Sequence, residues 1–363
     1  MHIRLSHMII CASALAFANP ANAQRTDNNA VTSADDAFGK TVVGDEQIGI
    51  YNPDDVRGFS PVSAGNLRLE GLFFDQQSYL TDRLIDGSTI HVGISAQGYP
   101  FPAPTGIADY SLRKPGDKFV ASIGLNYGPW YGKAAELDVQ VPIKGSQLGL
   151  IAGAGLYREG NPWGGSPKTE SYAISVRYEP GPKFSLQPFW SQIDVREDES
   201  QPLIFTSGDF LPARIPRNRF LGQKWADSEA KLNTFGVVSK GKAIGFDLAL
   251  GVFRSTFKGI MDHTDLLFGV DPAGAASDRV VVADRGNLFG STSGELKVSR
   301  NFIDGPRRHT IHATVRGRAL SRRYGGSDVI QLGPSSTILE DFRNAPVETF
   351  GAKTRDHVKQ TTL

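Results

Sequence analysis

A serine within a glycine-rich stretch is the residue most suggestive of nucleophilic chemistry. Ser95 lies in the sequence Gly-Ile-Ser-Ala-Gln-Gly that begins at Gly93. A nucleophile elbow needs its second glycine two residues after the serine, and Gln97 stands there instead. The sequence also lacks a phosphate-binding glycine loop, zinc-ligand spacing and a basic-aromatic nucleic-acid module. It therefore predicts that Ser95 is a loop residue and that the protein is not an enzyme, needs no cofactor and binds no nucleic acid.

Three residues near the middle of the sequence could bind a cation. Asp262, His263 and Asp265 have suitable side chains, but we expect them in a long polar loop, where such groups are usually solvated. We therefore predict no metal site. Glu197, Asp198 and Glu199 are interpreted either as a solvated loop face or as a divalent bridge to lipopolysaccharide. His91 and His312 have no ligand-spaced partners and are predicted to be polar lumen or plug-strand residues.

The most concentrated basic run lies in the last quarter of the sequence. Alternation along a strand would place Arg316 and Arg318 on one inward face. Two interpretations stay open: these arginines form salt bridges with nearby carboxylates, or they attract an anionic ligand. The run consists of Arg307, Arg308, Arg316, Arg318, Arg322 and Arg323.

The composition favours a turn-rich β protein over a helical one. The 363 residues include 40 glycines and 10% aromatic residues, and 39 basic residues nearly balance 38 acidic ones. The length predicts about two domains. The near-zero net charge disfavours binding to a polyanion, and no apolar run approaches the roughly 18 residues of a membrane helix.

The N-terminus has the pattern of an export signal. Arg4 precedes an apolar stretch at residues 8–17, and Ala-Asn-Ala at residues 21–23 fits a cleavage site before Gln24. The only cysteine, Cys11, lies within the apolar stretch, so we expect no disulfide in the mature chain.

Apolar and polar residues alternate with a period of two throughout the chain. The clearest segments are residues 136–141, 171–178, 245–252 and 311–316, and about ten such strands follow residue 116. The connections alternate in length: short at 143–146, 179–182, 240–243 and 301–308, long at 158–169, 194–229, 256–290 and 321–349. Short turns on one rim and long loops on the other are typical of an outer-membrane β-barrel, although a soluble sandwich also has alternating strands.

Several short motifs between residues 56 and 115 follow one another in an order that is found in a known protein family. The motifs contain Arg57, Gly58 and Phe59, then Asn66, Arg68 and Gly71, then Gly93, Tyr99, Gly106 and Asp109, and end in Lys114-Pro115. Their order resembles the plug domain of TonB-dependent outer-membrane receptors. Thr89 and Val92 stand where the family usually has a Glu and an Arg that lock the plug to the barrel, so that lock is not carried over.

The resemblance implies a layout and a function. We expect a signal peptide at residues 1–23, a small α+β plug at 24–116 and the N-terminal part of an antiparallel transmembrane β-barrel at 117–363. The resemblance implies import of a scarce ligand, usually a ferric siderophore, with the TonB complex as periplasmic partner and outer-membrane lipid and lipopolysaccharide as surroundings. Residues 40–43 are a faint match to a TonB box. By position, the ligand-contacting residues are Tyr51, Asn52, Ser60, Gln76, Gln77 and Tyr79, with Pro61 and Ser63 beside them.

The number of strands is small for this family. About ten strands are visible, whereas plugged transporters close with about 22. We therefore expect a truncated or split receptor whose remaining strands lie beyond Leu363. The alternatives are a passive porin or structural barrel with a folded-in constriction, and a soluble periplasmic binding module.

Overall fold

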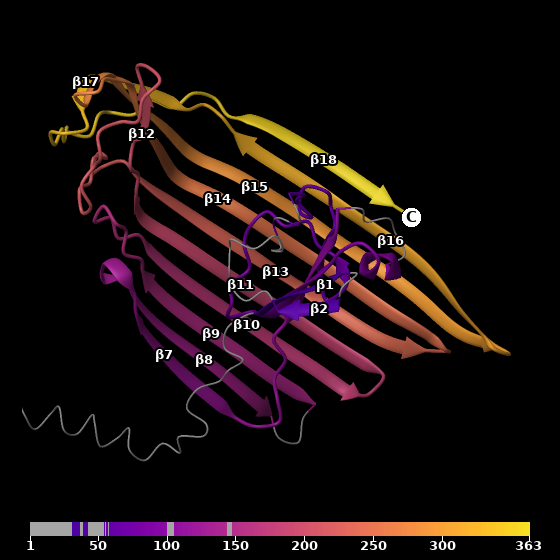
Figure 1. Ribbon diagram of the computed structural model, residues 1–363. Coiled ribbons are helices and arrows are strands. Elements are labelled where there is room, and N and C mark those ends of the chain that lie inside the picture. Colours follow the sequence, from indigo (N-terminus) through magenta and orange to yellow (C-terminus); the bar gives the residue numbers. More distant parts are fainter. Residues whose placement is uncertain are drawn as a thin grey trace, which may run out of the picture.

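The computed structural model describes residues 31–36, 39–42, 54, 56, 58–99, 105–143 and 147–363. These residues are mostly β-strand and form two sheets, a small one near the N-terminus and a large one after it (Figure 1). Among them no helix is long and apolar enough to cross a membrane. The expected signal peptide, Tyr51, Asn52 and Arg57 lie outside the described residues.

The ten strands that form the body of the large sheet are antiparallel. Each pairs with the strand before or after it in the chain, except that β11 pairs with β13 and β16 pairs with β18. It is twelve-stranded, with ten strands on the main path and two short ones, β12 (Leu203–Thr206) and β17 (Asp328–Ser336), at one rim. The prediction of about ten antiparallel strands is confirmed. In chain order the ten are β7 (Val120–Tyr127), β8 (Lys133–Ile143), β9 (Leu148–Arg158), β10 (Lys168–Gly181), β11 (Phe184–Glu199), β13 (Asp227–Ala243), β14 (Phe246–Val270), β15 (Ala275–Asp304), β16 (Arg307–Tyr324) and β18 (Thr354–Thr362).

Alternation gives the large sheet two different faces. On β14 the side chains of Leu250 and Val252 are 42% and 46% exposed on the outer face, whereas Phe253 and Ser255 are buried on the inner face. The sheet curves, and the N-terminal strands lie on its inner side (Figure 1). On this strand the exposed outer face is therefore the apolar one.

The two rims differ as expected, but one long connection is not a loop. Residues 182–183, 244–245 and 305–306 make tight turns on the short-turn rim. The prediction of a loop at residues 256–290 is wrong, because β14 and β15 continue through it and turn only at residues 271–274. Asp271 accepts a hydrogen bond from the Ala275 amide at 2.9 Å, and Gly274 adopts φ +83° in that turn. On this long-loop rim the two strands project well past the roughly ten residues that span a bilayer.

The N-terminal unit, defined as the described residues between 31 and 115, is built on a six-stranded mixed sheet. Its order is β2-β1-β5-β6-β3-β4, and β1 with β5 and β3 with β6 are parallel pairs. The expected α part of the α+β unit is not found in the described residues, which contain no α-helix there and only the 3-10 helix η3 (Ser95–Gly98). The strands are β1 (Val31–Asp36), β2 (Gly39–Val42), β3 (Leu67–Leu69), β4 (Leu72–Phe73), β5 (Ile85–His91) and β6 (Ile107–Leu112).

One hydrophobic core joins the N-terminal unit to the large sheet. Leu69 and Ile90 are fully buried within the unit, and Phe189 and Phe253 of the large sheet belong to the same cluster. The rings of Phe74 and Phe253 meet edge to face with centroids 5.6 Å apart. Because the core crosses from one sheet to the other, burial of apolar surface fixes the unit on the inner face.

Candidate functional site

Residues 70–79 of the N-terminal unit, here called the wall segment, run along the inner face of β13, β14, β15 and β16. The segment begins near the short-turn rim, where the Glu70 carboxylate binds the Lys240 ammonium at 2.7 Å. It ends near Ser255, which lies ten residues after the turn between β13 and β14. Its later residues therefore face the long-loop rim.

Side chains of the sheet satisfy the backbone amides of the wall segment. The segment pairs with a strand only at β4 (Leu72–Phe73), and there only with β3, so buried amides that face the large sheet need other acceptors. The inner face supplies hydroxyls and a carboxylate at the required positions. The amide of Phe73 donates to Glu295 Oε2 at 2.7 Å, that of Asp75 to Ser293 Oγ at 3.0 Å, and those of Gln77 and Ser78 to Ser255 Oγ at 3.0 and 3.1 Å.

A cavity of about 560 Å³, the upper cavity, lies at the end of the wall segment that faces the long-loop rim. Gln76 is buried beside it, whereas Tyr79 is 63% exposed. Two arginines of β16, Arg318 and Arg322, complete the wall opposite. The residues lining this cavity are Asp54, Val62, Ser63, Asp75, Gln76, Gln77, Ser78, Tyr79, Phe289, Arg318 and Arg322.

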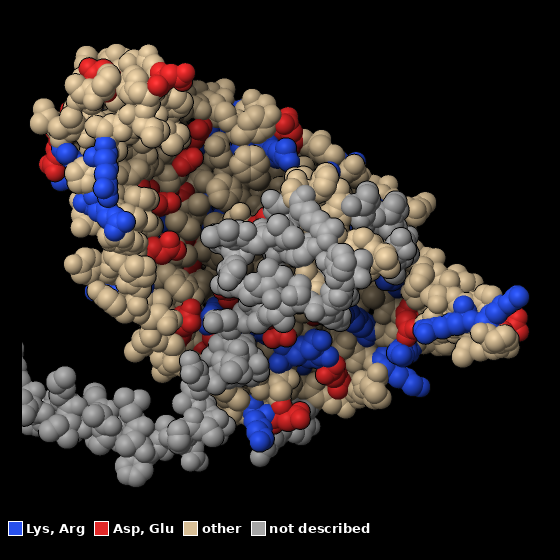
Figure 2. All heavy atoms as spheres, viewed as in Figure 1, with Lys and Arg blue, Asp and Glu red and all other residues tan. Residues whose placement is uncertain are grey.

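The two arginines of the upper cavity differ in their partners. Arg318 Nη1 lies 3.0 Å from Asp75 Oδ1, and its Nε donates to Gln360 at 2.6 Å. Arg322 is exposed and makes no hydrogen bond or ion pair within the described part of the chain. Its guanidinium group is thus available to a ligand. Figure 2 shows that basic and acidic side chains are interspersed over this face of the molecule.

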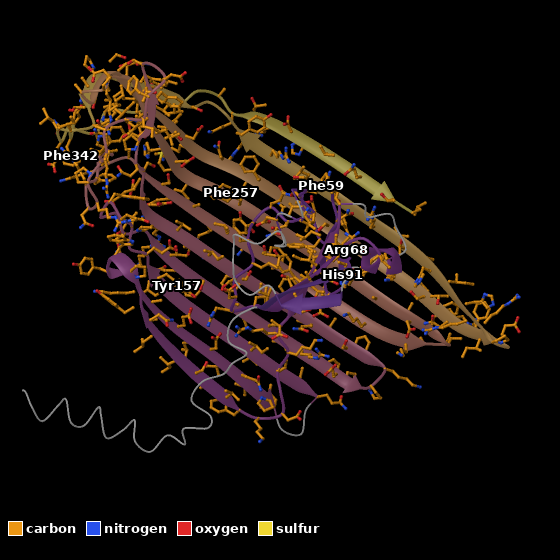
Figure 3. All side chains as sticks on the ribbon, in the orientation of Figure 1. Phe59, Arg68, His91, Tyr157, Phe257 and Phe342 are labelled. Carbon is orange, nitrogen blue, oxygen red and sulfur yellow. The ribbon has the colours of Figure 1, made fainter. Side chains whose placement is uncertain are left out.

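Two further arginines lie close to the Phe73 ring of the wall segment. Arg316 lies over the ring at 5.5 Å and Arg68 at 5.3 Å from its centroid. Arg68 is fully buried and donates to the Leu67 carbonyl at 2.9 Å. Burial lowers the pKa of Arg68 to about 10, an effect that the nearby Glu295 carboxylate opposes. Figure 3 shows Arg68 and His91 on the N-terminal unit in front of the large sheet.

Some of the residues that the sequence predicts to contact the ligand lie together in the structure. Gln76, Gln77 and Tyr79 line the upper cavity with Ser63, whereas Ser60 does not line it and accepts a hydrogen bond from the Ser63 amide at 3.2 Å. Arg318 lines the same cavity, whereas Arg316 lies over the Phe73 ring.

The motif residues that the structure describes shape turns and contacts within the N-terminal unit. Gly58, Gly71, Gly93 and Gly106 all have positive φ, and a Cβ on Gly106 would come within 3.1 Å of Val56 Cγ1. Phe59 bridges to Val56, Asn66 donates to Thr105 at 3.1 Å, and Tyr99 packs against His91 at 5.4 Å. The glycines adopt backbone conformations that are unfavourable for other residues. The other motif residues make specific contacts within the unit.

A buried group of ions that the sequence reasoning missed joins the N-terminal unit to β8. Arg83 is 2% exposed and forms an ion pair with Asp138, and its guanidinium also lies 3.5 Å from Glu136. Arg113 lies 3.5 Å from Asp138 on the other side. This group attaches the unit to the large sheet, whereas Thr89 and Val92 have no charge that could do so. The alternation of residues 136–141, which places Glu136 and Asp138 on one face, was the available signal.

The expected solvated loop around His263 is instead a buried cluster on the extended part of β14. Asp265 and Arg279 pair across β14 and β15, with Nε 3.0 Å from Oδ1. His263 is 5% exposed, and its two ring nitrogens lie 2.6 Å from the Asp227 carbonyl and 2.8 Å from Glu348. Within the described residues no group of three or more potential metal ligands occurs. The cluster holds the long-loop rim together.

The attachment at β8 gives a first prediction. Asp138→Ala should weaken the attachment of the N-terminal unit by about 3–5 kcal/mol, because it leaves two buried arginines without their shared carboxylate. Hydrogen exchange of β6 amides against denaturant concentration measures this. Glu197→Ala is the matched control, since it removes the exposed ion pair with Arg158 and should cost less than about 1 kcal/mol. Equal effects of the two substitutions would contradict a buried lock.

The half-buried Asp109 gives a second prediction. Burial raises the pKa of Asp109 to about 6, although the Gly71 amide, which donates at 2.9 Å, opposes the shift. Because the folded pKa lies above the unfolded value, the stabilising contribution is full at low pH and is lost as the pH rises through about 6.

The same exchange experiment should show that the unit loses on the order of 2 kcal/mol between pH 4.5 and 7.5. Asp109→Asn keeps an acceptor for Gly71 and should remove most of this loss. An unchanged pH dependence in the Asn variant would show that another group is responsible.

Comparison with protein-family models and with curated protein sequences finds no match. Comparison with solved structures finds strong similarity of fold. The Pseudomonas aeruginosa receptor FpvA, bound to a heterologous ferric pyoverdine, superimposes with a TM-score of 0.63 at 14% identity over 92% of this chain and 44% of that one. The ferric-catecholate import receptor Fiu of Escherichia coli K12 gives 0.63 at 13% identity, over 80% and 47%. The ferric preacinetobactin receptor BauA of Acinetobacter baumannii gives 0.63 at 12%, over 84% and 47%.

These neighbours support the resemblance seen in the short motifs. The chain spans less than half the length of each of these receptors. At such identities the similarity concerns the fold, and it covers both the N-terminal unit and the large sheet. This chain therefore has the fold of the siderophore receptors of the bacterial outer membrane.

Proposed function

We propose that this protein acts in the outer membrane as a receptor that binds an anionic ferric chelate and imports it by energy-coupled rearrangement of its N-terminal unit. The observation that carries the proposal is the upper cavity. There, polar residues of the wall segment face Arg318 and Arg322 of the barrel wall on the side of the long loops. The receptors of similar fold bind ferric siderophores, which supports the ligand class.

The chemistry of the upper cavity suits such a ligand. Two guanidinium groups attract an anion and can donate paired hydrogen bonds to its oxygens. Gln77 and the exposed Tyr79 add hydrogen-bonding groups and an aromatic face at small entropic cost. The volume of about 560 Å³ is within the range of small-molecule sites.

A receptor explains the packing of the lumen better than a passive pore does. A porin needs an open channel along the inner face, but the core of the N-terminal unit is continuous with Phe189, Val238 and Phe253 of the wall. Polar contacts of the wall segment and the Arg83 group add to that attachment. Moving the unit requires work, and the resemblance assigns that work to the TonB complex.

The coupling site and the N-terminal processing stay proposals from the resemblance. Residues 40–42 of the faint TonB box belong to β2 at the edge of the small sheet, and Val43 lies outside the described residues. We propose cleavage before Gln24 and a plug extending over residues 24–116, with the barrel strands following from residue 117.

We also propose that further strands complete the barrel. In the described residues the outer edges of β7 and β18 have no partner strand. Unpaired backbone groups are not tolerated in lipid, so a membrane-embedded form needs these edges paired. Strands pairing between β18 and β7 would give the wider cylinder that can hold the N-terminal unit.

Binding of a charged iron complex tests the proposal. Arg322→Gln should lower the affinity for ferric tris(catecholate), a trianionic probe, about tenfold, because a charge-assisted hydrogen bond contributes about 1.5–3 kcal/mol. The neutral ferric tris(acetohydroxamate) should bind more weakly and be little affected. Isothermal titration of the full chain in detergent measures both. Arg254→Gln, on the outer face of β14, is the control, and an equal loss in that variant, or equal binding of the two probes, would contradict the proposal.

A further inference from the structure

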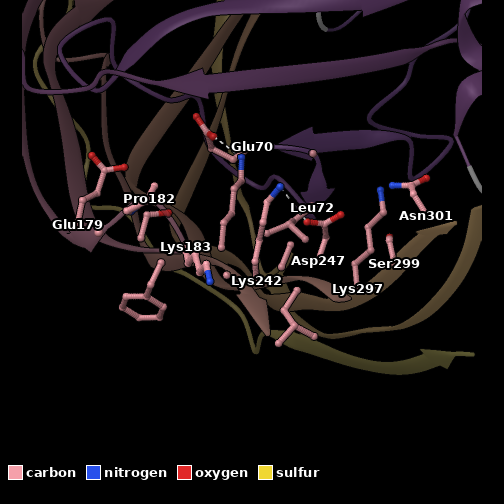
Figure 4. A pocket seen from close by; sticks show the side chains of 18 of the residues that line it. Glu70, Leu72, Glu179, Pro182, Lys183, Lys242, Asp247, Lys297, Ser299 and Asn301 are labelled. Carbon is pink, nitrogen blue, oxygen red and sulfur yellow. Dashed lines mark hydrogen bonds and ion pairs between the residues drawn. The ribbon is translucent and has the colours of Figure 1, made fainter. Parts of the chain in front are cut away.

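A second cavity lies on the opposite side of the N-terminal unit, at the short-turn rim (Figure 4). This lower cavity has a volume of about 530 Å³. The start of the wall segment, from Glu70 to Leu72, forms its roof, and the ends of β11, β13, β14, β15 and β16 form its walls. None of the residues predicted from the sequence to bind ligand lines it.

Lysines from separate parts of the wall converge on the lower cavity. Lys183 comes from the turn before β11, Lys240 and Lys242 from β13, and Lys297 from β15. Two of them are paired: Lys240 with Glu70 at 2.7 Å and Lys242 with Asp247 at 3.3 Å.

The other two ammonium groups have no such partner. Neither Lys183 nor the half-buried Lys297 forms a side-chain hydrogen bond or an ion pair with any described residue. The third carboxylate of the lining, Glu179, pairs with Arg177, which lies outside the lining. The lower cavity therefore has two uncompensated positive charges.

Further polar side chains lie beside these lysines. Ser299 and Asn301 follow Lys297 at two-residue spacing on β15, and His312 of β16 lies with its Nδ1 2.8 Å from Ser299 Oγ. Hydroxyl, amide and imidazole groups can donate to the oxygens of an anion that the ammonium groups attract. Figure 4 shows Lys297, Ser299 and Asn301 on one side of the cavity and Lys183 on the other.

We propose that the lower cavity is a second anion site, which holds the anionic cargo on the periplasmic side after it has passed the N-terminal unit. The direction in which the cargo moves in this inference rests on the proposed receptor function. The ligand class is a small carboxylate- or oxyanion-rich complex, because the site combines several ammonium groups with hydrogen-bond donors.

The cargo binds at the position on Lys240 that the Glu70 carboxylate occupies in this structure. It belongs to the N-terminal unit, where the Leu112 amide donates to it at 3.0 Å, yet its partner Lys240 belongs to the wall. When the unit moves, Glu70 leaves with it, and an anion of the cargo can take its place on Lys240. Lys183 and Lys297 attract the anion before that exchange occurs.

Thiol labelling measures the potential in the lower cavity without requiring transport. The probe is Ser299→Cys in a Cys11→Ser background, which removes the only native cysteine. In the full chain in detergent at low salt, anionic sulfonatoethyl methanethiosulfonate should react at least about tenfold faster than the cationic trimethylammonium analogue. Lys183→Gln with Lys297→Gln should reduce this ratio several-fold. The matched control, Lys258→Gln with Lys359→Gln, removes equal charge from exposed positions elsewhere and should leave the ratio unchanged.

Protection experiments identify the occupant. Millimolar citrate should slow labelling of the probe in the parent chain and not in the Lys183 and Lys297 variant. A preference for the cationic reagent, or a ratio insensitive to both lysines, would overturn the proposal. Protection by hexaglutamate peptide but not by citrate would also overturn it, because it would assign the cavity to a protein partner. A failure of ferric tris(catecholate) to bind at Arg322 would instead count against the receptor function alone.

Discussion

Hydrogen bonds from the backbone amides of the wall segment to side chains of the large sheet are the interaction on which the other features depend. A chain that lies against the middle of a sheet without joining it must find acceptors outside any strand ladder. Glu295, Ser293 and Ser255 supply them on the inner face. Each bond contributes about 1 kcal/mol, but an unsatisfied buried amide would cost more, so together they fix the position of the segment.

Two cavities of similar volume lie at the two ends of the segment. The wall segment ends in the upper cavity, where it faces Arg318 and Arg322, and begins at the lower cavity, where Glu70 faces Lys240. In both places a carboxylate of the segment neutralises a cation of the wall, Asp75 above and Glu70 below. A segment held by ion pairs and single hydrogen bonds can leave the wall without breaking a strand ladder. In the proposed rearrangement, movement of the segment would therefore separate Arg318 and Lys240 from these two carboxylates.

Alternation in the sequence was sufficient to predict the large sheet, because the outer face must be apolar and the inner face polar. It failed for residues 256–290, where buried positions are polar and paired, as with His263 and Asp265. Polar side chains at buried positions remove the contrast on which the prediction depends. The order of the short motifs predicted the N-terminal unit, since glycines such as Gly106 occupy positions where a side chain does not fit.

The candidate site was predictable only in part. Gln76, Gln77 and Tyr79 could be placed by resemblance, and Arg318 by strand parity. Arg322 could not be distinguished from its neighbours, because its lack of a partner depends on the three-dimensional placement of the carboxylates. The Arg83 group and the lysines of the lower cavity bring together residues more than 50 positions apart. A local sequence pattern can place a residue on one face of a strand, but it does not show which distant residue that side chain contacts.

Cross-linking of the wall segment to the sheet tests the central claim most directly. Ser78 Oγ and Ser255 Oγ lie 3.1 Å apart, so cysteines at the two positions in a Cys11→Ser background should form a disulfide on mild oxidation. Ser78→Cys with Val252→Cys, which lies on the outer face, should not. A disulfide in the first pair alone, seen as a mobility shift that reduction reverses, is the result expected if the segment lies against the inner wall. No disulfide in that pair, or equal yields in both, would contradict the account.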